Sequence, residues 1–299
     1  TEYPSLREAS CCRVEVVNGA ADKRVQAYNY RLCLTQVPEN RIPFEKPGDY
    51  DERQYELLFR LYEAGASNFP LNPVAMPNGK TDTNNNGAFS TDYVGMSAAY
   101  PQADYATRDR IAAAHVRYIK GLLWTLANHP RVPASVRAHA SKWGNAKDEF
   151  TDNGNFPYAL YVREARRMIG RYVMTEHDVQ GHHDAPEPVA LGSYTMDCHL
   201  TRRFIDSEGY LRGDGGLPAP RGFAPYGISY QSLTPLADQC TNLLVPVCLS
   251  SSHAAYGSIR MEPVYMMLGE ASATAASLAI DKNQTVQEVP YEVLKKHLL

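Results

Sequence analysis

Three side chains that could take part in binding or catalysis follow one another near the C-terminal end of the chain: Ser251, Ser252 and His253. They come directly after the apolar stretch NLLVPVCLS at residues 242–250, which predicts a strand. Two hydroxyl groups and an imidazole would therefore lie just past the carboxyl end of a strand. Pro263 then predicts the start of a helix, because proline suits the first helical turn.

This second helix has two features that favour a ligand. The amides of Val264, Tyr265 and Met266 would lack partners inside the helix, and together with the helix dipole they favour an anionic or electron-rich group. Small residues further along would let a backbone or a flat ligand approach closely: Gly269, Ala271, Ser272, Ala273, Ala275 and Ala276. The alternative is that this small-residue face packs on a sheet of the same chain.

A second charged pattern is PYALYVREARRMIGRY at residues 157–172, which predicts a helix from Pro157 to about Thr175. On such a helix Arg163 and Arg167 would lie one turn apart on one face, and Glu164 could reach Arg167. Planar guanidinium groups can hold a carboxylate or phosphate in a bidentate manner. The alternative is a solvated helix face with internal ion pairs.

A third pattern is the pair Asp197 and His199, two residues apart in GSYTMDCH at residues 192–199, which also predicts a strand. Residues two apart in a strand share one face, so the pair could serve acid–base chemistry.

Two stretches contain residue types that can bind a metal, but neither matches a complete metal-binding motif. The stretch from Asp82 begins like a calcium loop, but its twelfth position is Tyr93 in place of a bidentate glutamate. Around His177 the neighbouring His182 and His183 cannot easily point the same way. We therefore predict no metal site.

The elements that must position these groups alternate irregularly along the chain. A hairpin is predicted at 13–35, a long irregular stretch at 67–101, and a strand at 226–233. Helices are predicted at 51–64, 104–128 and 290–298; in the longest of these Ile111, Ala114, Tyr118, Leu122 and Leu126 mark one buried face. Because strands and helices are intermixed without a βαβ rhythm, we predict an α+β fold with a mixed sheet and packed helices.

The composition of the 299 residues narrows the function further. The net charge of −3 does not indicate a nucleic-acid-binding protein, and no apolar run approaches a membrane helix in length. The 20 tyrosines against two tryptophans suit clefts that hold polar organic ligands. Six dispersed cysteines do not form a disulfide framework, and nothing indicates a cellular compartment.

Several stretches in series resemble the FAD-dependent oxidoreductase family, many of whose bacterial members carry a xanthan lyase label. They are VQAYNYRLCLT, TDTNNNGAFSTDYVG, HVRYIKGLLWTLANHPRVP, KDEFTDNGNFPYALYVREARRMIGRYVMTEHD and NLLVPVCLSSSHAAYGSIRMEPVYMMLGEASATAA, within residues 25–280. In that family the final helix abuts the flavin, its amino end facing the pyrimidine side of the ring. The resemblance thus implies flavin contacts from Ser251, Ser252, Arg260, Met261, Glu262, Val264 and Tyr265.

Members of this family begin with a dinucleotide-binding βαβ unit, and this chain contains no G-x-G-x-x-G after any predicted strand. The chain also opens without methionine. The resemblance therefore implies the portion that follows that unit, with a substrate or cap-like domain at 1–240 and a flavin-facing segment at 241–299. We expect the chain alone to purify without FAD and to need the missing N-terminal segment as a partner.

The resemblance implies hydride transfer from a polar substrate, such as a sugar, to the flavin. We predict His253 or His199 as the base for a substrate hydroxyl group, and Arg163 and Arg167 as holders of a substrate anion. The alternative is a non-redox module that binds or cleaves acidic polysaccharides, since a histidine base and arginines would also serve β-elimination beside a uronate carboxylate.

Overall fold

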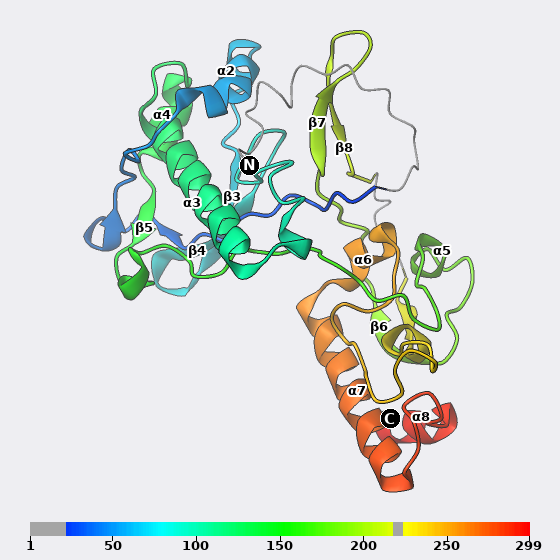
Figure 1. The fold of residues 1–299 in the computed structure, drawn as a ribbon. Coiled ribbons are helices and arrows are strands. Elements are labelled where there is room, and N and C mark those ends of the chain that lie inside the picture. The colour runs from blue at the N-terminus through cyan, green and yellow to red at the C-terminus, as the bar shows by residue number, and fades with distance from the viewer. Residues whose placement is uncertain (1–21, 218–223) are drawn as a thin grey trace. The chain divides into compact units, whose positions relative to one another are not determined.

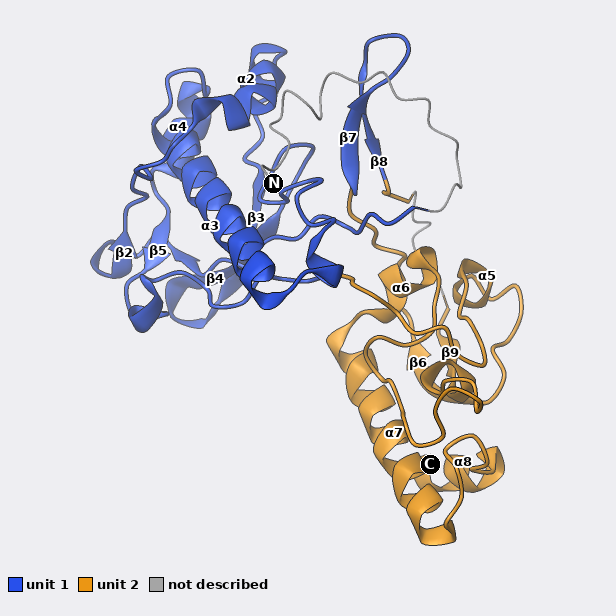
Figure 2. Ribbon diagram, in the orientation of Figure 1, with its two compact units in different colours: residues 1–163, 201–214 blue, residues 164–200, 215–299 orange. Residues whose placement is uncertain are grey.

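The computed structural model describes residues 22–217 and 224–299. The chain divides into two compact units (Figure 2): unit 1 comprises Thr1–Arg163 and Thr201–Asp214, and unit 2 comprises Glu164–Leu200 and Gly215–Leu299. Helices and small antiparallel sheets occur together in the chain, so the predicted α+β class is confirmed. The predicted strand at 13–17 lies outside the described residues.

Unit 1 contains a five-stranded antiparallel sheet in the order β2-β5-β1-β4-β3. Its strands are β1 (Leu34–Thr35), β2 (Arg41–Ile42), β3 (Leu71–Met76), β4 (Lys80–Asn85) and β5 (Gly144–Ala146). At the edge of this sheet β3 carries Pro73 and exposes Val74 and Met76.

The prediction of an irregular stretch at 67–101 is wrong where β3 and β4 form a hairpin. A turn at Pro77–Gly79 joins the two strands, and its Asn78 and Gly79 have φ angles of 62° and 66°. An Asn-Gly pair tolerates such positive φ values, and it is a strong hairpin signal when strand residues flank it. The many Asn, Pro and Gly residues obscured that signal.

The helices of unit 1 are α2 (Glu56–Glu63), α3 (Tyr105–Asn128) and α4 (Ala134–Ala140), as Figure 1 shows, and a further hairpin consists of β7 (Arg202–Ile205) and β8 (Leu211–Asp214). The Asp104 side chain caps α3 by accepting a hydrogen bond from the Thr107 amide. The predicted face of α3 is confirmed except at Ala114, which is half-buried. This face packs with β1 and α2 in one hydrophobic core, represented by Leu34, Phe59 and Leu122.

The predicted helix at 157–175 is wrong, because the backbone amides of this segment bond to residues far away in the chain. The Met168 amide donates to the Cys248 carbonyl, and the Arg171 amide donates to the Thr234 carbonyl. At Gly170 any side chain would collide with the Thr234 carbonyl, since an added Cβ would lie 2.7 Å from it. From Glu164 onward the segment therefore crosses unit 2 without forming a helix, and Arg163 and Arg167 do not share a helix face.

Unit 2 has the two-stranded antiparallel sheet of β6 (Pro188–Gly192) and β9 (Tyr226–Ser229). Its helices are α5 (Glu176–Val179), α6 (His253–Ile259), α7 (Glu262–Lys282) and α8 (Tyr291–Leu298). The strands predicted at 192–199 and 242–250 are wrong; next to the latter, Ser251 makes an isolated parallel bridge with Met174. The predicted strand at 226–233 is confirmed for its first four residues and then becomes a 3₁₀ turn.

Helix α7 begins where Pro263 predicts, and α8 confirms the predicted terminal helix. Ala271, Ala275 and Ala279 are buried on the face of α7 that packs against β6 and α8 (Figure 1). Part of the small-residue face thus packs on this chain's own strand. Gly269 has no atom within 4 Å of an added Cβ, whereas Ser272 is buried, so these two residues do not form one open face.

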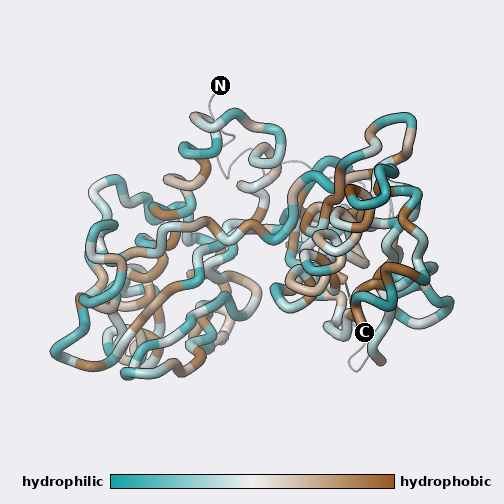
Figure 3. Tube along the Cα trace, turned by 90° about the horizontal axis from the view of Figure 1, so that it is seen from below, coloured by the Kyte–Doolittle hydropathy of each residue, from teal (hydrophilic) through white to brown (hydrophobic). Residues whose placement is uncertain are grey.

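Hydrophobic and hydrophilic stretches alternate along the chain within each unit, as the tube in Figure 3 shows. No helix in residues 22–217 or 224–299 combines the length and the apolar character that a bilayer span requires.

Candidate functional site

Most of the predicted site residues lie in unit 2, at the two ends of α6. Ser251, Ser252 and His253 lie at its start, and Arg260 follows its last residue. The Ser252 hydroxyl accepts a hydrogen bond from the Ala255 amide and so caps the helix. This short helix therefore fixes the separation between the His253 and Arg260 side chains.

At the start of α6 a single buried carboxylate, that of Glu164, meets two cationic groups. Its Oε2 lies 3.0 Å from the Arg167 Nη1 and 3.0 Å from the His253 Nδ1. The other ring nitrogen of His253 lies 3.2 Å from the carbonyl oxygen of Gly215. A neutral imidazole has one N–H, so a donor at both ring nitrogens requires the charged form. The Glu164 side chain is only 1% exposed, which strengthens these charged contacts.

The pKa of His253 follows this geometry. Burial opposes the charged ring, but hydrogen bonding with Cys198 and Glu164 outweighs it and raises the pKa of His253 to about 10. His253 is therefore an imidazolium at neutral pH. With Arg167 it gives two positive charges around the one negative charge of Glu164, which favours an anion nearby.

Aromatic side chains continue the arrangement from α6 to α7. The Arg167 guanidinium lies 5.3 Å from the ring centroid of Tyr256, and the Tyr256 and Tyr265 hydroxyl oxygens are 2.7 Å apart. Burial raises the pKa of both tyrosines, so both hydroxyl groups stay protonated at neutral pH. Tyr265, which was predicted to contact the flavin, is thus linked to Arg167 through the side chain of Tyr256.

At the far end of α6, Arg260 and His199 share the carboxylate of Asp197. Arg260 Nη2 donates to the main-chain oxygen of Asp197 at 3.0 Å and to its Oδ2 at 3.1 Å. His199 Nε2 lies 3.5 Å from the same Oδ2. The predicted Asp197–His199 pair is therefore close in space although no strand aligns it.

The first turn of α7 offers polar groups without a side-chain cap. Met261 occupies the N-cap position and makes no side-chain hydrogen bond, and Glu262 is exposed while Val264 is buried. Nearby in sequence, the Arg260 Nε and Ser251 Oγ atoms are buried and have no hydrogen-bond partner among the described residues. A helix start with free amides and such polar atoms can accept an electron-rich group.

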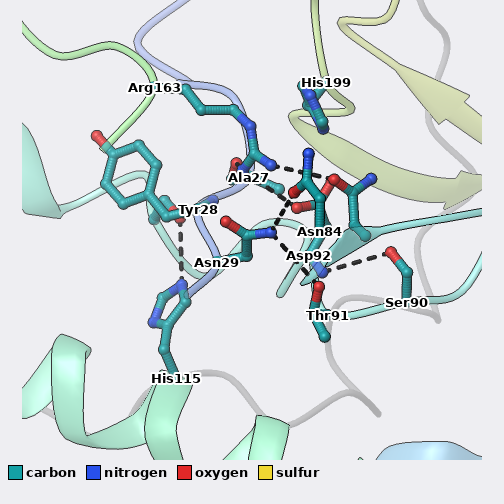
Figure 4. Close-up of polar contacts among 12 residues, drawn as sticks. Ala27, Tyr28, Asn29, Asn84, Ser90, Thr91, Asp92, His115, Arg163 and His199 are labelled. Atoms are coloured by element: carbon teal, nitrogen blue, oxygen red, sulfur yellow. Dashed lines mark hydrogen bonds and ion pairs between the residues drawn. The ribbon is translucent and has the colours of Figure 1, made fainter. Parts of the chain in front are cut away.

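Arg163, in contrast, belongs to unit 1 and lies in a buried polar network (Figure 4). Its Nη1 lies 3.1 Å from Asp92 Oδ1 and donates to the Ala27 carbonyl at 2.6 Å. Figure 4 also shows Asn29 close to Asn84 and Thr91, with which its amide makes hydrogen bonds of 3.0 and 3.4 Å. The Arg163 and Asp92 side chains are thus both buried in this network.

Two residues of the unit 2 arrangement were not singled out from the sequence as site residues. Glu164 was expected only to bridge to Arg167, a contact that is confirmed, and its contact with His253 joins residues far apart in the chain. Tyr256 lies within the SSSHAAYGS stretch, and the one sequence feature that could have pointed to it is that it is an aromatic residue among small ones. Among the described residues no three His, Cys, Asp or Glu side chains are grouped so that they could hold a metal ion.

Taken together, the fold and this arrangement define an α+β protein with a positively charged group beside the start of a long helix. A family model for FAD dependent oxidoreductases matches residues 2–298. The chain belongs to the FAD-dependent oxidoreductase family, and the resemblance inferred from the sequence is confirmed. No curated protein and no solved structure matches the chain.

Proposed function

We propose that this chain is the substrate-side portion of a FAD-dependent oxidoreductase that oxidises a polar substrate such as a sugar. The family match over residues 2–298 supports the redox class. The observation that carries the proposal is the α6–α7 junction, where an uncapped helix start follows the Arg260–Asp197–His199 group.

The residues at this junction fit the ring portion of FAD. The unpartnered Ser251 Oγ and Arg260 Nε atoms and the first turn of α7 suit the electron-rich carbonyl edge of a flavin. The segment 241–299 would supply the full set of contacts: Ser251, Ser252, Arg260, Met261, Glu262, Val264 and Tyr265. When bound, the flavin accepts a hydride and thereby supplies the redox chemistry.

The described residues do not form the kind of site that usually binds the pyrophosphate of FAD. Every pair of strands within the described ranges is antiparallel, so these residues contain no parallel βαβ unit. We therefore assign the nucleotide half of FAD to a dinucleotide-binding segment that is separate from the described residues.

The two candidate bases differ in their surroundings. His253 has an acceptor at each ring nitrogen, which favours the charged form and a role in holding an anion together with Arg167. His199 faces Asp197, whose carboxylate would orient the ring and stabilise the imidazolium that forms when His199 takes a proton from a substrate hydroxyl group. We therefore propose His199 as the base. The contacts of Arg163 favour a structural role for it.

The alternative function remains a module that binds or cleaves acidic polysaccharides. The positive charges of Arg167 and His253 would also suit a uronate carboxylate. The family match favours the redox function.

The deciding experiment is the absorbance spectrum of the product of the complete gene. We expect flavin bands that bleach when a substrate alcohol is added without oxygen, and we expect the present chain alone to leave gel filtration without flavin. A colourless gene product that generates unsaturated uronates from acidic polysaccharides would support the alternative.

A variant comparison locates the flavin contact. Arg260→Gln should reduce flavin retention in the complete gene product at least tenfold, because it removes the guanidinium at the α6–α7 junction. Arg166→Gln is the matched control, since Arg166 is exposed in the neighbouring segment. Equal flavin retention in both variants would remove Arg260 from the proposed site.

A further inference from the structure

The guanidinium of Arg167, in unit 2, is held in place by three contacts. Its Nε donates to the Ser251 carbonyl at 2.9 Å, and its Nη1 donates to the Glu164 carboxylate at 3.0 Å. Its central carbon lies 5.3 Å from the centroid of the Tyr256 ring. Because these contacts already order a long side chain, a ligand that binds Arg167 loses little affinity to that ordering.

Most of the hydrogen-bond donors of Arg167 remain available. A guanidinium has five N–H groups, and the two hydrogen bonds above use two of them, which leaves three. No described residue accepts a hydrogen bond from Nη2, and this atom is open to solvent on a side chain that is 20% exposed. Arg167 therefore presents charged donors that an anion can reach from outside.

The charge around Arg167 matches a single negative charge. Arg167 and His253 carry two positive charges, and Glu164 carries one negative charge. Both ring nitrogens of His253 already face protein oxygens, so His253 adds charge but no hydrogen bond to an incoming group. At the other end of α6 the charges of Arg260 and Asp197 offset each other. An excess of one positive charge suits a carboxylate, whereas a phosphate dianion would exceed it.

We infer that the substrate is a hydroxy acid, such as a sugar acid, whose carboxylate binds the Nη2 side of the Arg167 guanidinium. The inference rests on the proposed function, because it adds an acid group to the alcohol that is oxidised. Arg167 then determines specificity, since charge-assisted hydrogen bonds from its Nη2 to a carboxylate are stronger than those to a neutral oxygen. A neutral sugar lacks this contact.

Matched ligands test the inference on the product of the complete gene. Each acid is paired with its neutral amide: glucuronate with glucuronamide, galacturonate with galacturonamide, and lactate with lactamide. The flavin is first reduced with dithionite without oxygen, so that calorimetric titration measures binding without turnover. At least one acid should bind at least tenfold more tightly than its amide, as expected for the loss of a charged hydrogen bond.

The remaining outcomes of this titration count against the inference. If no acid binds more tightly than its amide, or if none binds at all, the inference is overturned. Glucose 6-phosphate is included as a second anion. If it binds more tightly than every acid, the assignment of a carboxylate is wrong.

Variants test whether Arg167 causes the preference. Arg167→Gln should bind acid and amide about equally. Arg171→Gln should keep the preference; it is the matched control, because Arg171 is 23% exposed in the same segment and instead contacts Glu187 and Gln287. A preference that survives in folded Arg167→Gln protein would overturn the inference. If that variant does not fold, Arg167→Lys keeps the charge without the planar fork and should weaken acid binding at least threefold; unchanged affinity would again overturn it.

Bleaching of the oxidised flavin separates this inference from the proposed function. An acid that binds but leaves the flavin bands unchanged would refute the redox function and leave the anion site at Arg167 intact. Neutral sugars that bleach the flavin as fast as the acids would overturn the inference and leave the redox function intact. Bleaching by acids in preference to their amides supports both.

Discussion

Arg163 and Arg167 belong to the same short segment, VREARR, yet their side chains meet different surroundings. Arg163 is 1% exposed in unit 1, where Asp92 and main-chain oxygen occupy its guanidinium. Arg167 is 20% exposed in unit 2, where it shares the Glu164 carboxylate with His253 and lies over an aromatic ring.

The difference separates an ion pair that supports the fold from one that can support chemistry. In unit 1 the Arg163 guanidinium and the Asp92 carboxylate are both almost fully buried, and main-chain and side-chain oxygens accept the other hydrogen bonds of Arg163. In unit 2 two positive groups face one carboxylate, and one of them can lose its proton. An excess of charge and a titratable group are what a ligand site needs.

The largest expected effect is the loss of stability when the buried Arg163–Asp92 pair is broken. Arg163→Met should lower the free energy of unfolding by about 3–5 kcal/mol, because it removes one partner of a buried ion pair. Denaturant titration measures this change. Arg166→Met, on an exposed neighbour, should shift stability by about 0.5 kcal/mol or less. Similar losses in both variants would mean that the Arg163 pair has no special structural role.

The next largest expected effect is a loss of stability at low pH, caused by the buried histidine of unit 1. His115 is fully buried, and burial lowers its pKa to about 4. Its Nδ1 lies 2.8 Å from the Ile111 carbonyl, which a neutral ring satisfies. The unfolded chain takes up a proton below about pH 6.5 while the folded protein does not, so stability should fall by about 3 kcal/mol between pH 6.5 and 4. A His115→Leu protein should lack this part of the pH dependence; identical acid profiles for the two proteins would argue against a neutral His115.

A smaller effect compares two helical glycines of unit 2. Gly257→Ala should cost about 1–3 kcal/mol, because its Cβ would lie 2.6 Å from the Cys198 sulfur and 3.2 Å from the Asp197 carbonyl. Gly269→Ala meets no atom within 4 Å and should stabilise α7 by about 0.5–1 kcal/mol. Thermal unfolding of the two variants would show opposite shifts; a destabilised Gly269→Ala protein would reveal a contact on that face.

The smallest effect is expected for His253, with the opposite sign to His115. Its folded-state pKa of about 10 lies above the unfolded value of 6.5. Its contribution to stability is therefore complete below pH 6.5 and is lost as the pH rises to about 10. Solvent screens the ring, which is 32% exposed, so the effect should be modest. The stability difference between the unmodified protein and His253→Gln should narrow over this range; a difference that widens would contradict a charged His253.

Sequence patterns predicted correctly those elements that are held by contacts between residues close together in the chain. Helix α3 has an acidic cap at Asp104 and apolar residues at helical spacing, and both can be read directly from the sequence. The segment 157–175 has comparable helical patterning, but its amides bond to residues near 234 and 248–250. Such partners are distant in the chain, so no local pattern indicates them.

The candidate site divides in the same way. His253 was singled out because it follows an apolar stretch, and the family resemblance pointed to Arg260 and Tyr265; the structure places all three at α6 and the start of α7. The contact between Glu164 and His253 could not be predicted, because it depends on how residues 164–174 cross unit 2. Sequence therefore proposed candidate groups, while the structure was needed to show which of them lie together.

The edge position of β3 also bears on whether another molecule can add a strand to this sheet. A free sheet edge can recruit a strand from another molecule through its row of outward amides. Pro73 has no amide hydrogen and interrupts that row, and β2, at the opposite edge of the sheet formed by the described residues, is only 2 residues long. Neither edge offers a continuous row of hydrogen-bonding groups, so we expect the exposed Val74 and Met76 not to make β3 a template for a strand of another molecule.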